Sequence, residues 1–112
     1  RVDRRQRQMC IRDRSEAEFQ NWVLEQAGEY GWMRWHTMLA KYVPKGRDKQ
    51  PLIDKGFPDL VLAKGEKLIF AELKTEKGRV RPEQKQWLDL LDGVIWRPRD
   101  MDEITERLSE GE

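Results

Sequence analysis

Two apolar segments joined by a two-residue turn constrain the fold of this 112-residue chain more than any other feature. They are "PDLVLAK" (58–64) and "KLIFAELKT" (67–75), and the intervening Gly65 and Glu66 are typical of a tight hairpin. The first segment is apolar at nearly every position, which indicates a strand covered on both faces. The sequence therefore predicts that this hairpin belongs to the core.

The remaining segments alternate between helical and strand patterns. We expect helices at about 16–29, after a capping box formed by Ser15 and Glu18, and from Pro82 until Gly93 ends the element. The segments "WMRWHTMLA" (32–40) and "VIWRP" (94–98) are typical of strands, and a closing helix follows with Met101, Ile104 and Leu108 turned inward. The expected order is αβββαβα, an α/β fold.

Composition restricts the function only weakly. The chain has 22 basic and 21 acidic side chains and a formal net charge of +1, so a nucleic-acid surface would require local segregation of charge. The single cysteine excludes an internal disulfide, and no Cys/His cluster has the spacing of a zinc site. No apolar run approaches the roughly 20 residues of a membrane helix. We expect a cytoplasmic protein without a membrane partner.

Two basic segments fall outside the regular pattern. Residues 1–14 are rich in arginine and lack an apolar period, which favours a disordered tail over a phosphate-binding arm. The string "RRQRQMCIRDR" also resembles a translated sequencing adapter, which indicates a tail foreign to the fold. We place a single domain at 15–112. The expected loop at 41–56 carries basic residues that suit either a solvated face or a phosphate backbone.

Charged side chains stand where strands normally carry none. Asp59 begins the first apolar segment, and Glu72 and Lys74 lie on one face of the second. The two-residue turn brings Asp59 opposite Glu72, and two such carboxylates in a partly dry place repel each other unless a cation neutralises them. Together with the backbone carbonyl after Glu72, that of Leu73, they form an oxygen ligand set that suits Mg²⁺ or Mn²⁺. Lys74 is then placed to orient or deprotonate a water.

The string "GFPD", twelve residues and then "ELK" resembles the signature of the PD-(D/E)XK nuclease superfamily. The fuller set "SEAEFQNWVLEQAGEYGW", "GFPDLVL", "ELKTEKGRVRPEQKQWL" and "VIWRP" is similar to its virus-type replication and repair nuclease (VRR-Nuc) branch. The resemblance implies a restriction-endonuclease-like αβββαβ core with a C-terminal helix, in which helices flank a mixed central sheet. It also implies a Mg²⁺- or Mn²⁺-dependent phosphodiesterase acting on DNA.

The resemblance assigns roles residue by residue. It implies Asp59 and Glu72 as metal ligands, Lys74 as the catalytic lysine and a glutamate of the first helix as a further ligand. We favour Glu16 over Glu18, because Glu16 lies on the stripe expected to face the sheet. Gln84 lies where the family has a glutamine near the active site, so it is expected to bind a water or a phosphate, or to be a satisfied polar group at a helix start. Basic residues on the loop after the second apolar segment are expected to contact DNA: Lys77, Arg79 and Arg81.

The histidine and the tryptophans give weaker indications of function. His36, the single histidine, lies within an expected strand, which favours a structural or edge role over that of a general base. The five tryptophans are expected in the core rather than on a stacking platform. They are Trp22, Trp32, Trp35, Trp87 and Trp96.

The sequence therefore predicts a metal-dependent DNA endonuclease that selects branched or junction DNA in bacterial or phage replication and repair. The alternative is a catalytically silent DNA-binding module with the same fold. Analogy with stand-alone members of the family suggests a homodimer.

Overall fold

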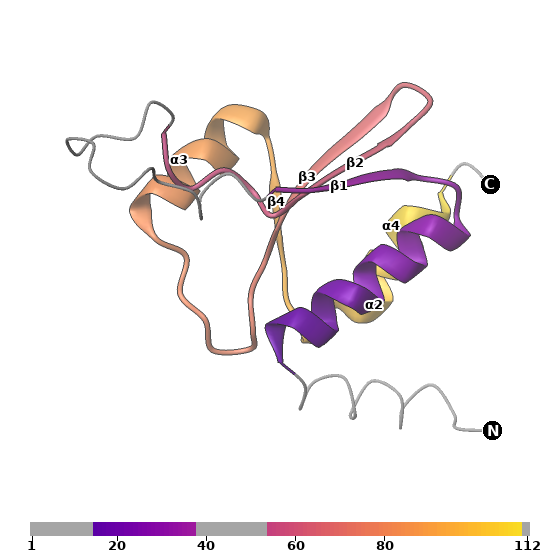
Figure 1. The fold of residues 1–112 in the computed structure, drawn as a ribbon, viewed down its shortest axis with the longest axis horizontal. Helices are drawn as coiled ribbons and strands as arrows, with labels where there is room; N and C mark the ends of the chain where they lie inside the picture. The colour runs from indigo at the N-terminus through magenta and orange to yellow at the C-terminus, as the bar shows by residue number, and fades with distance from the viewer. Residues whose placement is uncertain (1–14, 38–53, 111–112) are drawn as a thin grey trace, which may run out of the picture.

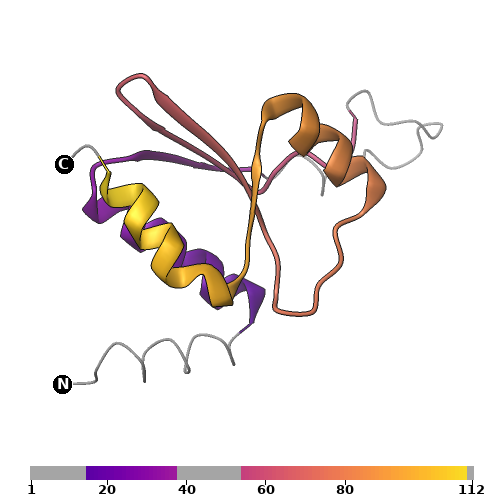
Figure 2. The same cartoon turned by 180° about the vertical axis from the view of Figure 1, so that it is seen from behind.

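The computed structural model describes residues 15–37 and 54–110 of the chain. Figures 1 and 2 show the fold from opposite sides. The chain forms helix α2 and strand β1, then the hairpin of β2 and β3, helix α3, strand β4, the short helix η2 and helix α4. Their bounds are α2 Glu16–Glu29, β1 Met33–His36, β2 Leu60–Lys64, β3 Lys67–Leu73, α3 Pro82–Leu91, β4 Val94–Trp96, η2 Pro98–Asp100 and α4 Met101–Ser109.

The strands form one mixed sheet in the order β1-β2-β3-β4. β1 pairs with β2 and β2 with β3 in antiparallel register, whereas β3 and β4 run parallel. A parallel neighbour requires a crossover connection, and α3 lies in the connection from β3 to β4. The sheet therefore consists of three antiparallel strands, β1 to β3, and of β4, which runs parallel to β3 at the edge.

Helices α2 and α4 lie side by side on one face of the sheet (Figures 1 and 2). The buried stripe of α2 consists of Phe19, Val23 and Ala27, at helical spacing. Trp32 Nε1 donates to the carbonyl oxygen of Leu108 at 2.8 Å, which joins the end of α4 to the turn after α2. The capping box of Ser15 and Glu18 begins α2 as predicted.

The opposite face of the sheet is only partly covered. Phe57 packs edge-on against Phe70 of β3 and Trp87 of α3, which places α3 on this side. Farther along the same face, Met33 and Trp35 are 77% and 51% exposed. The expectation that all five tryptophans lie in the core is thus wrong for Trp35, because α3 does not extend over the edge strand that carries it.

The order αβββαβα and the restriction-endonuclease-like fold are confirmed. The expected basic tail at 1–14 and the basic residues at 41–49 lie outside the described residues. Among the described residues, the structure contains no helix with the length and apolarity of a membrane span.

Two leucines on opposite faces of the sheet test this layering. Leu62 is fully buried beneath the helices, whereas Leu68 is 55% exposed. We expect Leu62→Ala to lower the free energy of unfolding by about 2–5 kcal/mol, since it leaves a cavity. Leu68→Ala should change it by less than about 0.5 kcal/mol. Urea unfolding followed by tryptophan fluorescence measures both, and equal losses would contradict the assignment of the faces.

Candidate active site

The hairpin register places Asp59 opposite Glu72. Leu60 pairs with Ala71, so the next residues outward are these two acids. Asp59 Oδ2 accepts a hydrogen bond from the backbone N–H of Leu73 at 3.0 Å, and its carbonyl oxygen accepts one from the N–H of Thr37 at 2.8 Å. The end of the hairpin thus brings the two carboxylates together, as the two-residue turn predicts.

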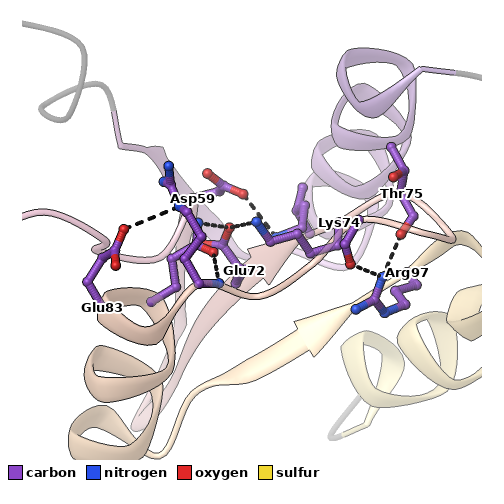
Figure 3. Close-up of polar contacts among 10 residues, drawn as sticks. Asp59, Glu72, Lys74, Thr75, Glu83 and Arg97 are labelled. Atoms are coloured by element: carbon purple, nitrogen blue, oxygen red, sulfur yellow. Dashed lines mark hydrogen bonds and ion pairs between the residues drawn. The ribbon is translucent and has the colours of Figure 1, made fainter.

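Glu72 is a charged group in a dry place. Its side chain is 2% exposed, and Lys74 Nζ lies 3.4 Å from its Oε2 atom. Burial, and secondly the negative charge of Asp59, raise the pKa of Glu72 from 4.5 to about 7, although the ammonium group of Lys74 lowers it. The lysine therefore offsets only part of the cost of ionising Glu72. Figure 3 shows Asp59, Glu72 and Lys74 close together at the end of β3.

Gln84 joins the candidate site to the start of α3. Its Nε2 donates to Glu72 Oε2 at 2.9 Å, and its Oε1 accepts from the backbone N–H of Arg81 at 2.9 Å. The oxygen and the nitrogen of the side-chain amide thus each form a hydrogen bond within the protein, and the side chain is buried. In this arrangement Gln84 orients Glu72 and caps the helix at the same time.

Gly56, in the "GFPD" motif, permits this approach of α3. It has a φ of +95°, and an added Cβ atom would lie 2.8 Å from the carbonyl carbon of Glu83 and 2.9 Å from the nitrogen of Gln84. A side chain here would therefore strain the backbone and push against the first turn of α3. The glycine lets Asp59 and Gln84 approach Glu72 from two different segments.

A cavity of about 870 Å³ opens between the starts of α2 and α3. Asp59, Glu72, Lys74 and Gln84 all line it, and Glu16 lines it from the side of α2. Glu18 instead accepts hydrogen bonds from the N–H and hydroxyl group of Ser15. The remaining lining residues are Ser15, Ala17, Gln20, His36, Thr37, Gly56, Phe57 and Arg81.

The β1 side of the cavity holds polar groups that the sequence did not single out as a site. His36 Nε2 and Gln20 Nε2 lie 3.0 Å apart, and both residues line the cavity. His36 is also the last residue of β1. Thr37 Oγ1 is buried and has no hydrogen-bond partner in the part of the chain that the structure describes. The strand pattern around His36 gave no sign of a site, because Gln20 and His36 meet only through tertiary packing.

The basic residues after β3 lie on the irregular segment 74–81. Lys77, Arg79 and Arg81 are exposed, and Arg81 Nε lies 3.3 Å from Glu83 Oε1. Arg81 lines the cavity, whereas Lys77 and Arg79 are not among its lining residues. The segment therefore leads from the carboxylates toward solvent.

The donors present fit a divalent cation. Glu72 Oε1 is buried and has no hydrogen-bond partner among the described residues, which is costly for a carboxylate oxygen. A cation shared by Asp59 and Glu72 would satisfy this atom and relieve their repulsion, and two carboxylates with the carbonyl of Leu73 are the oxygen ligands that Mg²⁺ and Mn²⁺ prefer. Within the described ranges, no group of three Asp, Glu, His or Cys side chains converges closely enough to hold a metal ion. Water or substrate oxygens would have to complete the coordination.

A restriction-endonuclease-like fold with an Asp, a Glu and a Lys at the end of its central hairpin defines a nuclease-type protein. The family model of the VRR-NUC domain matches residues 4–96. The chain therefore belongs to the VRR-NUC domain family. No curated protein and no solved structure matches the chain.

The raised pKa of Glu72 makes stability depend on pH in a defined direction. Between about pH 4.5 and 7 the folded protein keeps a proton on Glu72 that the unfolded chain releases, so rising pH favours unfolding. From pH 5 to 8, without metal, we expect the wild type to lose about 2–3 kcal/mol more stability than Glu72→Gln. Urea unfolding in EDTA at both pH values measures this difference. If the free energy of unfolding changed equally in the wild type and in Glu72→Gln between pH 5 and 8, the pKa of Glu72 would not be raised in the folded protein.

Proposed function

We propose that this VRR-NUC domain is a metal-dependent DNA endonuclease that hydrolyses phosphodiester bonds. The observation that carries the proposal is the buried carboxylate of Glu72, which lies beside the half-buried Asp59 and, within the described residues, pairs with one ammonium group, that of Lys74. A site that only stabilised the fold would not need charged side chains here, because a pair of apolar side chains would pack more favourably. The cavity between α2 and α3 offers room for a phosphate group beside the carboxylates.

Each residue of the cluster has a distinct proposed role. Asp59, Glu72 and the carbonyl of Leu73 would hold Mg²⁺ or Mn²⁺, and Glu16, which lines the cavity from α2, would contribute through a water molecule because it does not converge with the two carboxylates. A bound cation supplies charge neutralisation at the phosphoryl oxygens and a lower pKa for the attacking water. Lys74 orients that water or takes its proton, and its charge offsets the negative charge that develops in the transition state. Gln84 keeps Glu72 in the orientation that leaves Oε1 unpaired.

DNA binding is proposed to rest on the segment 74–81. Its exposed residues Lys77, Arg79 and Arg81 lie between the candidate catalytic lysine and α3, where they suit contacts with a phosphate backbone. Such contacts release counterions, so affinity should fall steeply as salt increases.

The resemblance to stand-alone members of the family further suggests branched or junction DNA as substrate, in bacterial or phage replication and repair in the cytoplasm. A homodimer would bring two sites to the strands of one such substrate. The open sheet face with Met33 and Trp35 is an apolar surface that a second copy could cover.

Removal of either central group should abolish cleavage. Asp59→Asn keeps an acceptor for the N–H of Leu73 but loses the charge, and Lys74→Ala removes the ammonium group. We expect both variants to reduce the rate of DNA hydrolysis in Mg²⁺ or Mn²⁺ by at least about 100-fold. Gel assays with labelled junctions, flaps, duplexes and single strands measure the rates and also identify the preferred DNA structure.

Lys67→Ala is the matched control, because Lys67 lies at the far end of the same strand and bonds only to the carbonyl oxygen of Glu110 in the described part of the chain. It should cleave like the wild type. A folded Asp59→Asn variant that still cut DNA in Mg²⁺ would rule out the proposed site. A wild type that bound DNA without cutting it under any metal would instead support a silent DNA-binding module.

Metal binding should stabilise the folded protein through the same carboxylates. At pH 8, a divalent cation at about 100 times its Kd should raise the free energy of unfolding by about 2.7 kcal/mol. Asp59→Asn should lose most of this gain, whereas Glu103→Gln, an exposed change on α4, should keep it. Thermal unfolding with Mn²⁺ and with EDTA gives the comparison, and an equal gain in both variants would place the metal elsewhere.

A further inference from the structure

The segment 74–81, which we call the basic loop, is fixed at both ends by hydrogen bonds. At its start the N–H of Lys74 donates to the carbonyl oxygen of Trp96 at 3.0 Å, which extends the pairing of β3 with β4. At its end the N–H of Arg81 is bound by Gln84. Between these points a turn closes where the N–H of Gly78 donates to the carbonyl oxygen of Thr75 at 3.2 Å.

One side chain holds that turn from outside. Arg97 Nη1 donates to the carbonyl oxygens of Thr75 and Gly78, each at 2.7 Å, and it lies 3.4 Å from that of Glu76 (Figure 3). Arg97 is the first residue after β4 and is only partly exposed. Its own N–H donates to Asp100 Oδ2 at 2.9 Å, which fixes its backbone. A rigid guanidinium group thus satisfies carbonyls that lie on both sides of Lys77.

These contacts affect the basic loop rather than Lys74. The backbone of Lys74 is held by Trp96 and its ammonium group by Glu72, neither of which depends on Arg97. Lys77 lies within the turn from Thr75 to Gly78, whose carbonyl oxygens Arg97 binds. Arg79 is the first residue after this turn. Without this anchor the turn would gain conformational freedom, and that freedom would be lost again on each binding event.

We propose that Arg97 is a positioning residue that pre-forms the basic loop, so that Lys77 and Arg79 meet a DNA backbone without a cost of ordering. The proposal rests on the proposed nuclease function, since it assigns the loop to DNA. Arg97 itself does not touch the substrate, because its guanidinium group bonds to the loop.

The test compares Arg97→Gln with Arg99→Gln. Both variants lose one positive charge near the loop, but Arg99 is 58% exposed and lies 3.8 Å from a carboxylate oxygen of Glu76. In metal-free buffer, fluorescence anisotropy with a labelled duplex should show about five- to tenfold weaker binding for Arg97→Gln, with an unchanged slope of log Kd against log salt, because the same phosphate contacts still form after the turn is ordered. Arg99→Gln should bind within about twofold of the wild type, with an unchanged slope.

Kinetics separate positioning of DNA from chemistry. For Arg97→Gln we expect a higher KM for DNA with kcat within about twofold of the wild type. Hydrolysis of bis(4-nitrophenyl) phosphate, a phosphodiester too small to reach Lys77 and Arg79 from the cavity, should be unchanged. In a Lys77→Ala/Arg79→Ala background, Arg97→Gln should add less than about twofold, because the residues it positions are gone.

Circular dichroism and thermal unfolding verify that each variant is folded. If Arg97→Gln fails to fold, Arg97→Lys carries the same comparisons, since it keeps the charge but not the planar group. Equal DNA affinities of the Arg97 and Arg99 variants, or full additivity with the loop mutations, would overturn the proposal. A wild type that binds DNA without cutting it would contradict the nuclease function alone, whereas one without DNA affinity would overturn both.

Discussion

The ionisable group of Glu72 sets the main physical constraint on this protein. The fold removes the carboxylate from water and places it beside Asp59, yet within residues 15–37 and 54–110 a single ammonium group, that of Lys74, is adjacent to it. Gly56 gives up a side chain so that α3 can approach, and Gln84 uses both ends of its amide to keep Glu72 in place. These features cost stability, and the cation proposed above would offset that cost.

The layering of the fold gives the site its access. Helices α2 and α4 cover one face of the sheet, and α3 covers part of the other (Figures 1 and 2). The starts of α2 and α3 therefore lie on two sides of one cavity. The carboxylates stand at the rim of the core beside this cavity, where backbone pairing holds them. A site within the sheet would be equally rigid but closed to a polymer.

The parts of the site that follow from local pattern could be predicted from the sequence. A two-residue turn fixes the hairpin register, and the register alone places Asp59 opposite Glu72. The capping box likewise indicated that Glu18 is engaged with Ser15, which leaves Glu16 to line the cavity. The exposure of Trp35 could not be predicted, because it depends on how far α3 extends over an edge strand. The contacts of Arg97 with the basic loop were equally hidden, since the carbonyl oxygens that it binds lie 19 to 22 residues away in the chain.

The parallel pairing of β4 with β3 also has a consequence for the order of events during synthesis. All of the candidate catalytic residues up to Lys74 leave the ribosome before β4, yet the carbonyl that binds the N–H of Lys74 belongs to Trp96, and the basic loop is anchored by Arg97. A nascent chain that ends before β4 therefore carries the acids and the lysine without the strand that holds their shared end in place. The backbone of Lys74 and the basic loop therefore gain these anchors only once β4 has been made and has paired with β3.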